Sequence, residues 1–360
     1  MIGQKGIPAT YGGIERHVHE LATRLFARGH EVVVYCRSHY TPKDARVEGV
    51  ELVRLASWNT KHLDAITHVA FSSVHCLFAH ADVVHYHALG PSSLAWLPRV
   101  VGRRIVTTVH GLDWRRDKWG SIAAGYLRLS ERAATSFSDA TIVVSRTLED
   151  HFRRAGATRL HYIPNGTVLP EPGPLEPIRR RGLAPDDYIL FVGRLVPEKG
   201  LHTLLEAHRV AAPERKLVVA GEGHFTDEYV DRCRALANEN VDFVGSVYGD
   251  ELASLQQHAA VVVVPSALEG LSIALLEAMS FGRAVLGSDI PENAEVLDGC
   301  GASFRTGDPA DLASRLRALL DDPARRAELG RLARIRIERE YDWDRVTEQT
   351  LDVYRTVASR

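Results

Sequence analysis

Short apolar runs alternate with longer helical patterns along the whole chain, and this alternation limits the choice of fold more than any other feature. Runs such as EVVVYC at 31–36 and AVVVVPS at 260–266 are apolar at nearly every position, whereas GIERHVHELATRLFARG at 13–29 has a helical period. A strand that is apolar throughout must be buried on both faces, which is typical of a parallel sheet covered by helices. The sequence therefore predicts an α/β protein with parallel sheets.

The predicted strands form two groups, separated by a stretch rich in proline and glycine. The first group is 31–36, 50–56, 82–88, 104–110 and 140–145, and the second is 188–194, 216–223, 241–247, 260–266 and 284–289. The stretch between them, at 163–185, has no periodicity and is predicted to be a linker. Because 360 residues exceed twice the length of a typical domain, we expect two Rossmann-like domains. Ligands bind at the carboxyl ends of such strands, which predicts a central cleft faced by both sheets.

The chain opens on a very short strand and a loop rich in glycine. Only Met1 and Ile2 precede GQKGIPATYGG, where a Rossmann domain usually has a full strand. Either the true start lies upstream or the strand has two residues. Gly12 and Gly13 then lead into a predicted helix, where backbone amides can approach a phosphate or a sugar closely. A plain turn is the equal alternative.

Charge is distributed unevenly along the chain. Residues 1–170 hold 21 Lys and Arg against 14 Asp and Glu, a net charge of +7, whereas residues 171–360 hold 23 against 32, a net charge of −9. A basic half favours an anionic partner such as lipid head groups, with clusters at 103–104 and 115–119 as contacts; an accident of surface composition explains it equally well. Nothing resembles a nucleic-acid-binding module.

Several absences in the sequence bear on localisation. No apolar run reaches the ~18 residues that a membrane span needs, and no signal-peptide pattern opens the chain. The four cysteines include no CxxC pair, which suits reduced thiols. These features favour a cytoplasmic protein, and the basic half adds a peripheral position on the inner face of the membrane as an option.

The stretch EGLSIALLE brackets an apolar helical run with two glutamates, directly after a predicted strand. Eight helical residues rise about 12 Å, whereas glycosidase carboxylates lie roughly 5 to 9.5 Å apart. The spacing therefore disfavours a hydrolytic acid pair and favours two contacts on one extended polar ligand. Glu269 lies where the helix opens, beside amides that favour anions, those of Gly270, Leu271 and Ser272. Glu277 lies deeper, where a hydrogen-bonded structural role is the alternative.

The segment GRLVPEKG follows another predicted strand and carries two cations. It lacks the GK[ST] of a Walker A loop. Arg194 and Lys199 share this strand-to-helix loop, and two cations there can bind a diphosphate and stabilise its charge as it leaves. Two ordinary surface cations are the alternative.

Histidines mark the ends of two predicted strands of the first half. His110, in HGLDW, lies at the carboxyl end of the predicted strand 104–110 and is expected to face the cleft, with a structural histidine as the alternative. His85 and His87 lie on one face of 82–88, but no third metal ligand is evident nearby. We therefore predict no metal site.

Taken together and in this order, these segments resemble the GT-B retaining glycosyltransferases of family 4, the glycosyl transferases group 1. The resemblance covers nearly the whole chain, and its most specific part is the E-x7-E element from Glu269 to Glu277 with GRLVPEKG upstream. The opening GQKGIPATYGGIE is similar to bacterial rhamnosyltransferases of surface-polysaccharide assembly. The family's usual glycine-proline is replaced by Gly223-His224.

The resemblance implies a role for each matching position. Arg194 and Lys199 would hold the nucleotide diphosphate, and His110 would lie beside the transferred sugar. Glu269 would contact hydroxyls of the sugar, and Glu277 those of the ribose. His110, Arg194, Lys199 and Glu269 would thus be catalytic. The other implied donor-binding positions are Gly12, Gly13, Val247, Gly270, Leu271 and Ser272.

The implied activity is that of a retaining glycosyltransferase of the hexosyltransferase class. It would move a rhamnosyl, mannosyl or glucosyl group from a UDP-, GDP- or dTDP-sugar to a glycan or lipid-linked acceptor in bacterial surface polysaccharide or glycolipid synthesis. The nucleotide sugar is a co-substrate, and neither a cofactor nor a metal is implied, because the two cations stabilise the leaving diphosphate. The alternatives are an enzyme like the nucleotide-sugar 2-epimerases and a catalytically silent partner that binds nucleotide sugars.

The resemblance also implies how the chain is divided. Residues 1–168 would bind the acceptor and residues 169–340 the nucleotide sugar. Residues 341–360 would form a helix that crosses back to the first domain.

Overall fold

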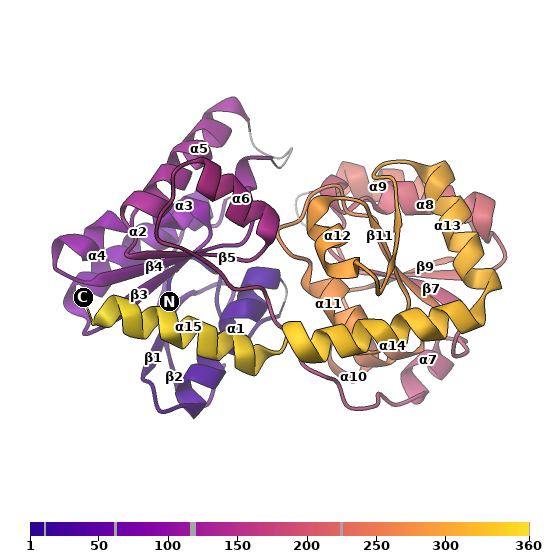
Figure 1. Ribbon diagram of the computed structural model, residues 1–360, viewed down its shortest axis with the longest axis horizontal. Coiled ribbons are helices and arrows are strands. Elements are labelled where there is room, and N and C mark those ends of the chain that lie inside the picture. The colour runs from indigo at the N-terminus through magenta and orange to yellow at the C-terminus, as the bar shows by residue number, and fades with distance from the viewer. Residues whose placement is uncertain (11, 61–62, 116–119, 224–225, 360) are drawn as a thin grey trace. The chain divides into compact units, whose positions relative to one another are not determined.

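A computed structural model describes the chain except for Tyr11, 61–62, 116–119, 224–225 and Arg360, and except for the side chain of Ile122 (Figure 1). Residues 116–119 of the predicted basic cluster therefore lie outside the described residues. So does His224, which stands where the family usually has a proline. The chain divides into two compact units. The first comprises Met1–Gly166 together with Trp343–Arg360, and the second comprises Thr167–Asp342.

The first unit contains parallel strands that are joined through the first two residues of the chain. β1 (Val32–Arg37) pairs with β2 (Val50–Leu55), and β3 (Val83–His87), β4 (Arg104–Val109), β5 (Ala140–Val143) and β6 (Leu160–Tyr162) pair in that order. The N–H of Ile2 donates to the carbonyl of His85 at 2.9 Å, and the carbonyl of Met1 accepts from Tyr35 at 3.1 Å. Met1 and Ile2 thus connect β1 to β3.

Helices cover the strands of the first unit and bury apolar stripes against them. They are α1 (Gly13–Ala27), α2 (Leu63–Phe78), α3 (Leu89–Ser92), α4 (Trp96–Val100), α5 (Ser121–Ser136), α6 (Arg146–Arg154) and α15 (Trp343–Ala358), with a 3-10 turn at Asp113–Arg115. On α1, Val18, Leu21 and Leu25 are buried, at the spacing of one helix face. The C-terminal helix α15 packs on α1, where Arg28 pairs with Glu348 at 2.6 Å (Figure 1).

The second unit contains one parallel sheet with the strand order β12-β11-β10-β7-β8-β9. Its strands are β7 (Tyr188–Val192), β8 (Lys216–Ala220), β9 (Val241–Gly245), β10 (Val261–Val264), β11 (Val285–Ser288) and β12 (Ala302–Phe304). The chain adds β8 and β9 on one side of β7, then returns to add β10 on the other. The switch point of the topology, where ligands of such sheets bind, therefore lies between β7 and β10.

The helices of the second unit lie over this sheet (Figure 1). They are α7 (Glu176–Arg180), α8 (Leu201–Ala211), α9 (Asp227–Leu236), α10 (Gly249–His258), α11 (Ile273–Ser280), α12 (Pro291–Leu297), α13 (Pro309–Asp321) and α14 (Pro323–Glu340), with a 3-10 turn at Pro197–Lys199. The ten predicted strands all occur: β1 has the predicted length but begins one residue later, and the other nine are shorter by a residue or more. Sequence periodicity missed β6 and β12, because three residues are too few to show a period.

A buried histidine on α2 should make the first unit sensitive to acid. His68 is fully buried, and burial, together with the nearby Arg37, lowers its pKa to about 4, while Asp64, His39 and the carbonyl of Cys36 also face the ring. In the unfolded chain the ring takes a proton below its ordinary pKa, so stability is complete above about pH 6.5 and falls as the pH drops toward about 4.

Because of His68, we therefore expect the free energy of unfolding of the first unit to fall by about 2 kcal/mol when the pH is lowered from 8 to 5. Urea unfolding at the two pH values should show His68→Leu losing that much less stability than the wild type on acidification. The replacement of His30, an exposed histidine, by leucine should leave the pH dependence unchanged. An equal loss in His68→Leu and the wild type would contradict the account.

In the part of the chain that the structure describes, no helix has the length and apolar character needed to cross a membrane.

Candidate functional site

Lys199 and Glu269 meet at the switch point of the second sheet. Lys199 ends the turn that follows β7, and Glu269 lies in the loop that follows β10. The Nζ of Lys199 lies 2.5 Å from Oε1 of Glu269, which also accepts a hydrogen bond from the hydroxyl of Ser266 at 2.7 Å. Two residues that are seventy positions apart in the sequence thus form one ion pair, at the place where this class of sheet binds ligands.

Close backbone packing holds the two loops against each other. Gly200, which follows Lys199, has φ +68°, and a Cβ atom on it would lie 2.0 Å from the carbonyl oxygen of Pro265. The N–H of Ala267 donates to the carbonyl of Glu198 at 2.8 Å. Only glycine combines this left-handed conformation with this close contact. Gly200 is therefore the residue that lets the Lys199 turn rest on the end of β10.

Arg194 lies on the same edge of the sheet, where β7 ends. The next residue, Leu195, donates its N–H to the carbonyl of Glu222 at 2.9 Å, so the loop is tied to the one after β8. Gly221 has φ +147°, and a Cβ atom on it would meet the carbonyl oxygen of Gly193 at 1.9 Å. Arg194 is partly buried. The residues before and after it, Gly193 and Leu195, both contact the loop that follows β8.

The residues whose amides are predicted to bind the donor, Gly270, Leu271 and Ser272, directly precede helix α11. Ser272 is its N-cap, and its hydroxyl accepts from the N–H of Leu275 at 3.4 Å. Leu271 and Ser272 are buried, and Gly270 is partly buried. Glu277 is partly buried further along α11, where its Oε2 accepts from Nε2 of Gln256 at 3.4 Å. Glu269 and Glu277 therefore lie before and within one short helix, as the sequence spacing predicts.

The remaining donor-binding candidates lie on other loops. Val247 is buried, two residues beyond β9, which is the edge strand of the second sheet. Gly12 and Gly13 are in the first unit, at the start of α1, where Gly12 has φ +102° and Glu15 lies against it. The structure thus brings together the candidates that follow β7 and β10, whereas His110, Gly12 and Gly13 belong to the other unit.

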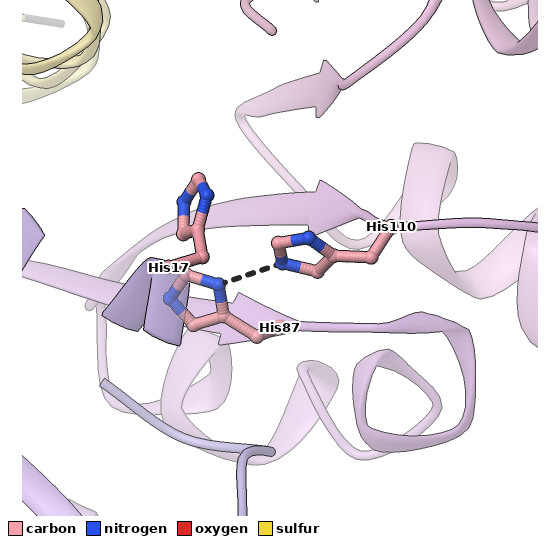
Figure 2. Close-up of side chains that lie close together, drawn as sticks. All are labelled: His17, His87 and His110. Atoms are coloured by element: carbon pink, nitrogen blue, oxygen red, sulfur yellow. Dashed lines mark hydrogen bonds between the residues drawn. The ribbon is translucent and has the colours of Figure 1, made fainter. Parts of the chain in front are cut away.

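His110 lies in a group of histidines in the first unit (Figure 2). Its Nε2 is 3.2 Å from Nδ1 of His87, the last residue of β3. The ring of His17, on α1, stands edge-on to it with centroids 4.8 Å apart. The ring of His85 also packs on that of His87, with centroids 4.1 Å apart. No third ligand for His85 and His87 is evident in the sequence, but in the structure His17 and His110 lie beside His87.

All of these rings are neutral at neutral pH. Burial lowers the pKa of His17 to about 4, and it holds the pKa of His85, His87 and His110 well below the ordinary value. Neutral imidazoles keep one nitrogen lone pair each, so they can accept a hydrogen bond or bind a metal. A helical period places His17 on the buried face of α1, but no sequence signal indicates that this face meets the end of β3.

Two family models cover most of the chain between them. The model described as Glycosyltransferase Family 4 matches residues 11–169, and the one described as Glycosyl transferases group 1 matches residues 177–336. The alpha-maltose-1-phosphate synthase of Mycolicibacterium smegmatis is 30% identical over 393 residues, which cover 98% of this chain and 97% of that protein. The chain belongs to glycosyltransferase family 4. The predicted family and the predicted enzyme class, a hexosyltransferase, are confirmed.

Solved structures show which fold this family 4 glycosyltransferase has. Sucrose-phosphate synthase from Thermosynechococcus elongatus matches 99% of this chain and 96% of its own with a TM-score of 0.84 and 23% identity. Anabaena HepE in complex with UDP-glucose matches 99% of this chain and 98% of its own with a TM-score of 0.80 and 18% identity. The fold is GT-B, as predicted, with two Rossmann-like units built on parallel sheets.

Proposed function

We propose that this family 4 glycosyltransferase transfers a hexose from a nucleotide diphosphate sugar to a glycan or lipid-linked acceptor, with retention of the anomeric configuration and without a divalent metal. The observation that carries the proposal is the Lys199–Glu269 pair at the switch point between β7 and β10. A cation at this edge suits a diphosphate, and a carboxylate beside it suits sugar hydroxyls. HepE, of the same fold, was solved with UDP-glucose, which makes UDP-glucose the first donor to test.

Each candidate residue has a physical task in this proposal. Lys199 and Arg194 bind the diphosphate and stabilise the charge that develops on it as the bond to the sugar breaks. Because the two cations do this, the leaving group needs no metal. Glu269 orients the sugar through its hydroxyls and favours an oxocarbenium-like transition state, and Glu277 accepts from the ribose hydroxyls. His110 contacts the transferred sugar.

A donor screen tests this proposal. Thermal unfolding of the full chain is followed with UDP-, GDP- and dTDP-sugars, and we expect the midpoint to rise with one nucleotide class, because a ligand that binds only the folded state stabilises it. Release of the nucleoside diphosphate is then measured with glycan and lipid-linked acceptors. Conversion of the donor without an acceptor would instead favour an epimerase, and donor binding without turnover would favour a silent binding partner.

We further propose that the acceptor is reached at an anionic membrane surface. Exposed apolar side chains run along α2 at helical spacing. The most exposed are Phe71, Val74 and Phe78, and Phe78 is 84% exposed. Trp96 and Val100 of α4, a helix in contact with α2, are exposed as well. Large apolar side chains gathered on exposed helices mark an interaction site.

Two arginines lie close to these helices. Arg103 donates to the carbonyl of Ala79 at 2.6 Å, directly after α2, and Arg99, on α4, pairs with Asp139 at 3.0 Å. Apolar side chains bordered by cations suit the head-group region of an anionic membrane. These contacts would give the basic first half of the chain its predicted partner.

Vesicle binding should therefore depend on α2. We expect the double variant Phe71→Ser, Phe78→Ser to bind phosphatidylglycerol vesicles about tenfold or more weakly than the wild type, because it loses two large apolar side chains. Sedimentation at low and high salt measures this, and Val210→Ser, which removes an apolar side chain that is 64% exposed on α8, is the matched control. Absence of binding by the wild type at low salt would remove the membrane proposal.

A further inference from the structure

Three histidines from separate elements meet inside the first unit. His17 comes from α1, His87 from the end of β3 and His110 from the loop after β4 (Figure 2). One nitrogen of each ring lies within 4.8 Å of the other two. In the part of the chain that the structure describes, this group contains imidazoles only, with no carboxylate or thiolate.

One of the ring nitrogens that could bind an ion has nothing to bond. Nε2 of His17 is buried and has no hydrogen-bond partner among the described residues, and the side chain is 3% exposed. A buried polar atom left unpaired costs about 1–3 kcal/mol. Apolar residues would fill this space without that cost, so packing alone does not account for the group.

Asn165 sets which nitrogen of His17 is free. Its side-chain oxygen lies 3.0 Å from Nδ1 of His17. An amide oxygen only accepts hydrogen bonds, so Nδ1 carries the proton and Nε2 keeps its lone pair. A second residue that accepts from the far nitrogen of a histidine is the usual support of a metal ligand. Asn165 would have that part here.

We propose that His17, His87 and His110 bind one divalent transition-metal ion, with Zn²⁺ as the ion that the group suits best. Imidazole nitrogens prefer zinc, copper and nickel over magnesium or calcium, which prefer oxygen. Three protein ligands leave one position open for water or another ligand.

The spacing of the nitrogens is close to what zinc requires. Two nitrogens at 2.0–2.1 Å from a tetrahedral zinc lie about 3.3 Å apart, and Nδ1 of His87 lies 3.2 Å from Nε2 of His110. The ring of His17 turns to bring its nitrogen from within 4.8 Å to that distance. Each neutral ring gives one lone pair, and whichever of His87 and His110 donates the present hydrogen bond moves its proton to the other ring nitrogen.

This site lies in the first unit, whereas the Lys199–Glu269 pair lies in the second, so metal binding does not depend on the proposed function. The two are linked only through His110. An ion bound to His110 occupies the ring that is proposed to contact the sugar, so bound metal is expected to slow the transfer rather than to take part in it. Metal binding is therefore measured directly and without a donor.

Cobalt absorption tests the site on the full chain. The protein is stripped with a chelator and titrated with Co²⁺, whose tetrahedral complexes absorb strongly in the visible range. We expect one Co²⁺ per chain, displaced by one equivalent of Zn²⁺. His17→Ala and His87→Ala should weaken binding by more than about 100-fold, and Asn165→Ala by about 10–100-fold, as for other residues that support a metal ligand.

His68→Ala is the matched control, because His68 is an equally buried histidine of the same unit that does not belong to the group. It should bind Co²⁺ as the wild type does, and circular dichroism checks that each variant is folded. A wild-type protein that gives no tetrahedral spectrum would overturn the proposal whatever the variants do. Folded His17→Ala and His87→Ala proteins that bind as tightly as the wild type would overturn it as well.

Discussion

Lys199→Ala is expected to lower kcat/KM for glycosyl transfer by about 100- to 1,000-fold, the usual effect of removing one group that stabilises charge in a transition state. Lys199, in the turn after β7, lies 2.5 Å from Glu269, and we propose that it binds the leaving diphosphate there. Glu269 keeps its hydrogen bond from Ser266 in this variant. The fold should therefore persist with some loss of stability, so rates are measured well below the unfolding midpoint of the variant.

Lys216→Ala is the matched control for this prediction. Lys216 is an exposed lysine of the same unit, at the first position of β8, and therefore at the opposite end of the parallel strands from Lys199. Its loss should leave kcat/KM within about twofold of the wild type, because a surface cation far from the reacting atoms contributes little. A folded Lys199→Ala protein with the wild-type rate would exclude the proposed role of Lys199 at the diphosphate.

Gly200→Ala is expected to destabilise the second unit by about 2–5 kcal/mol, since the left-handed conformation and the lack of space both oppose a side chain. Its φ is +68°, and the added Cβ would lie 2.0 Å from the carbonyl oxygen of Pro265. Relief of that contact must move the Lys199 turn away from the end of β10. We therefore expect transfer activity to fall together with stability, as measured by urea unfolding and by initial rates.

Gly182→Ala separates the two causes. Gly182 has φ +69°, nearly identical to that of Gly200, but nothing lies within 4 Å of an added Cβ. Its substitution should cost only the conformational part, about 1–2 kcal/mol, and leave the rate unchanged. Equal losses of stability in the two variants would show that contact with Pro265 does not hold the Lys199 turn in place.

Much of the architecture could be predicted from the sequence, because a strand buried on both faces is apolar at every position. All ten predicted strands occur in the structure. The strands that were missed, β6 and β12, have three residues each and lie next to β5 and β11 in their sheets. Their pairing depends on a neighbouring strand, which no local periodicity records.

The candidate site was predicted in part. Sequence spacing places Glu269 and Lys199 at strand ends, but their contact follows from β7 and β10 being neighbours in the sheet, which is a property of the topology. The requirement for glycine at position 200 depends on contact with the carbonyl of Pro265, which is 65 positions away in the chain. His17 was not predicted as a site residue, since its meeting with His87 depends on how α1 packs on the sheet.

The most direct test of the central claim is the release of nucleoside diphosphate by the wild-type protein in the presence of EDTA. With the nucleotide sugar selected by the donor screen and a suitable glycan or lipid-linked acceptor, we expect that EDTA does not lower the rate of release, because Arg194 and Lys199 stabilise the leaving group. The account also predicts that the transferred sugar keeps its anomeric configuration. Release that stops when divalent ions are removed, or no release with any pair of donor and acceptor, would contradict it.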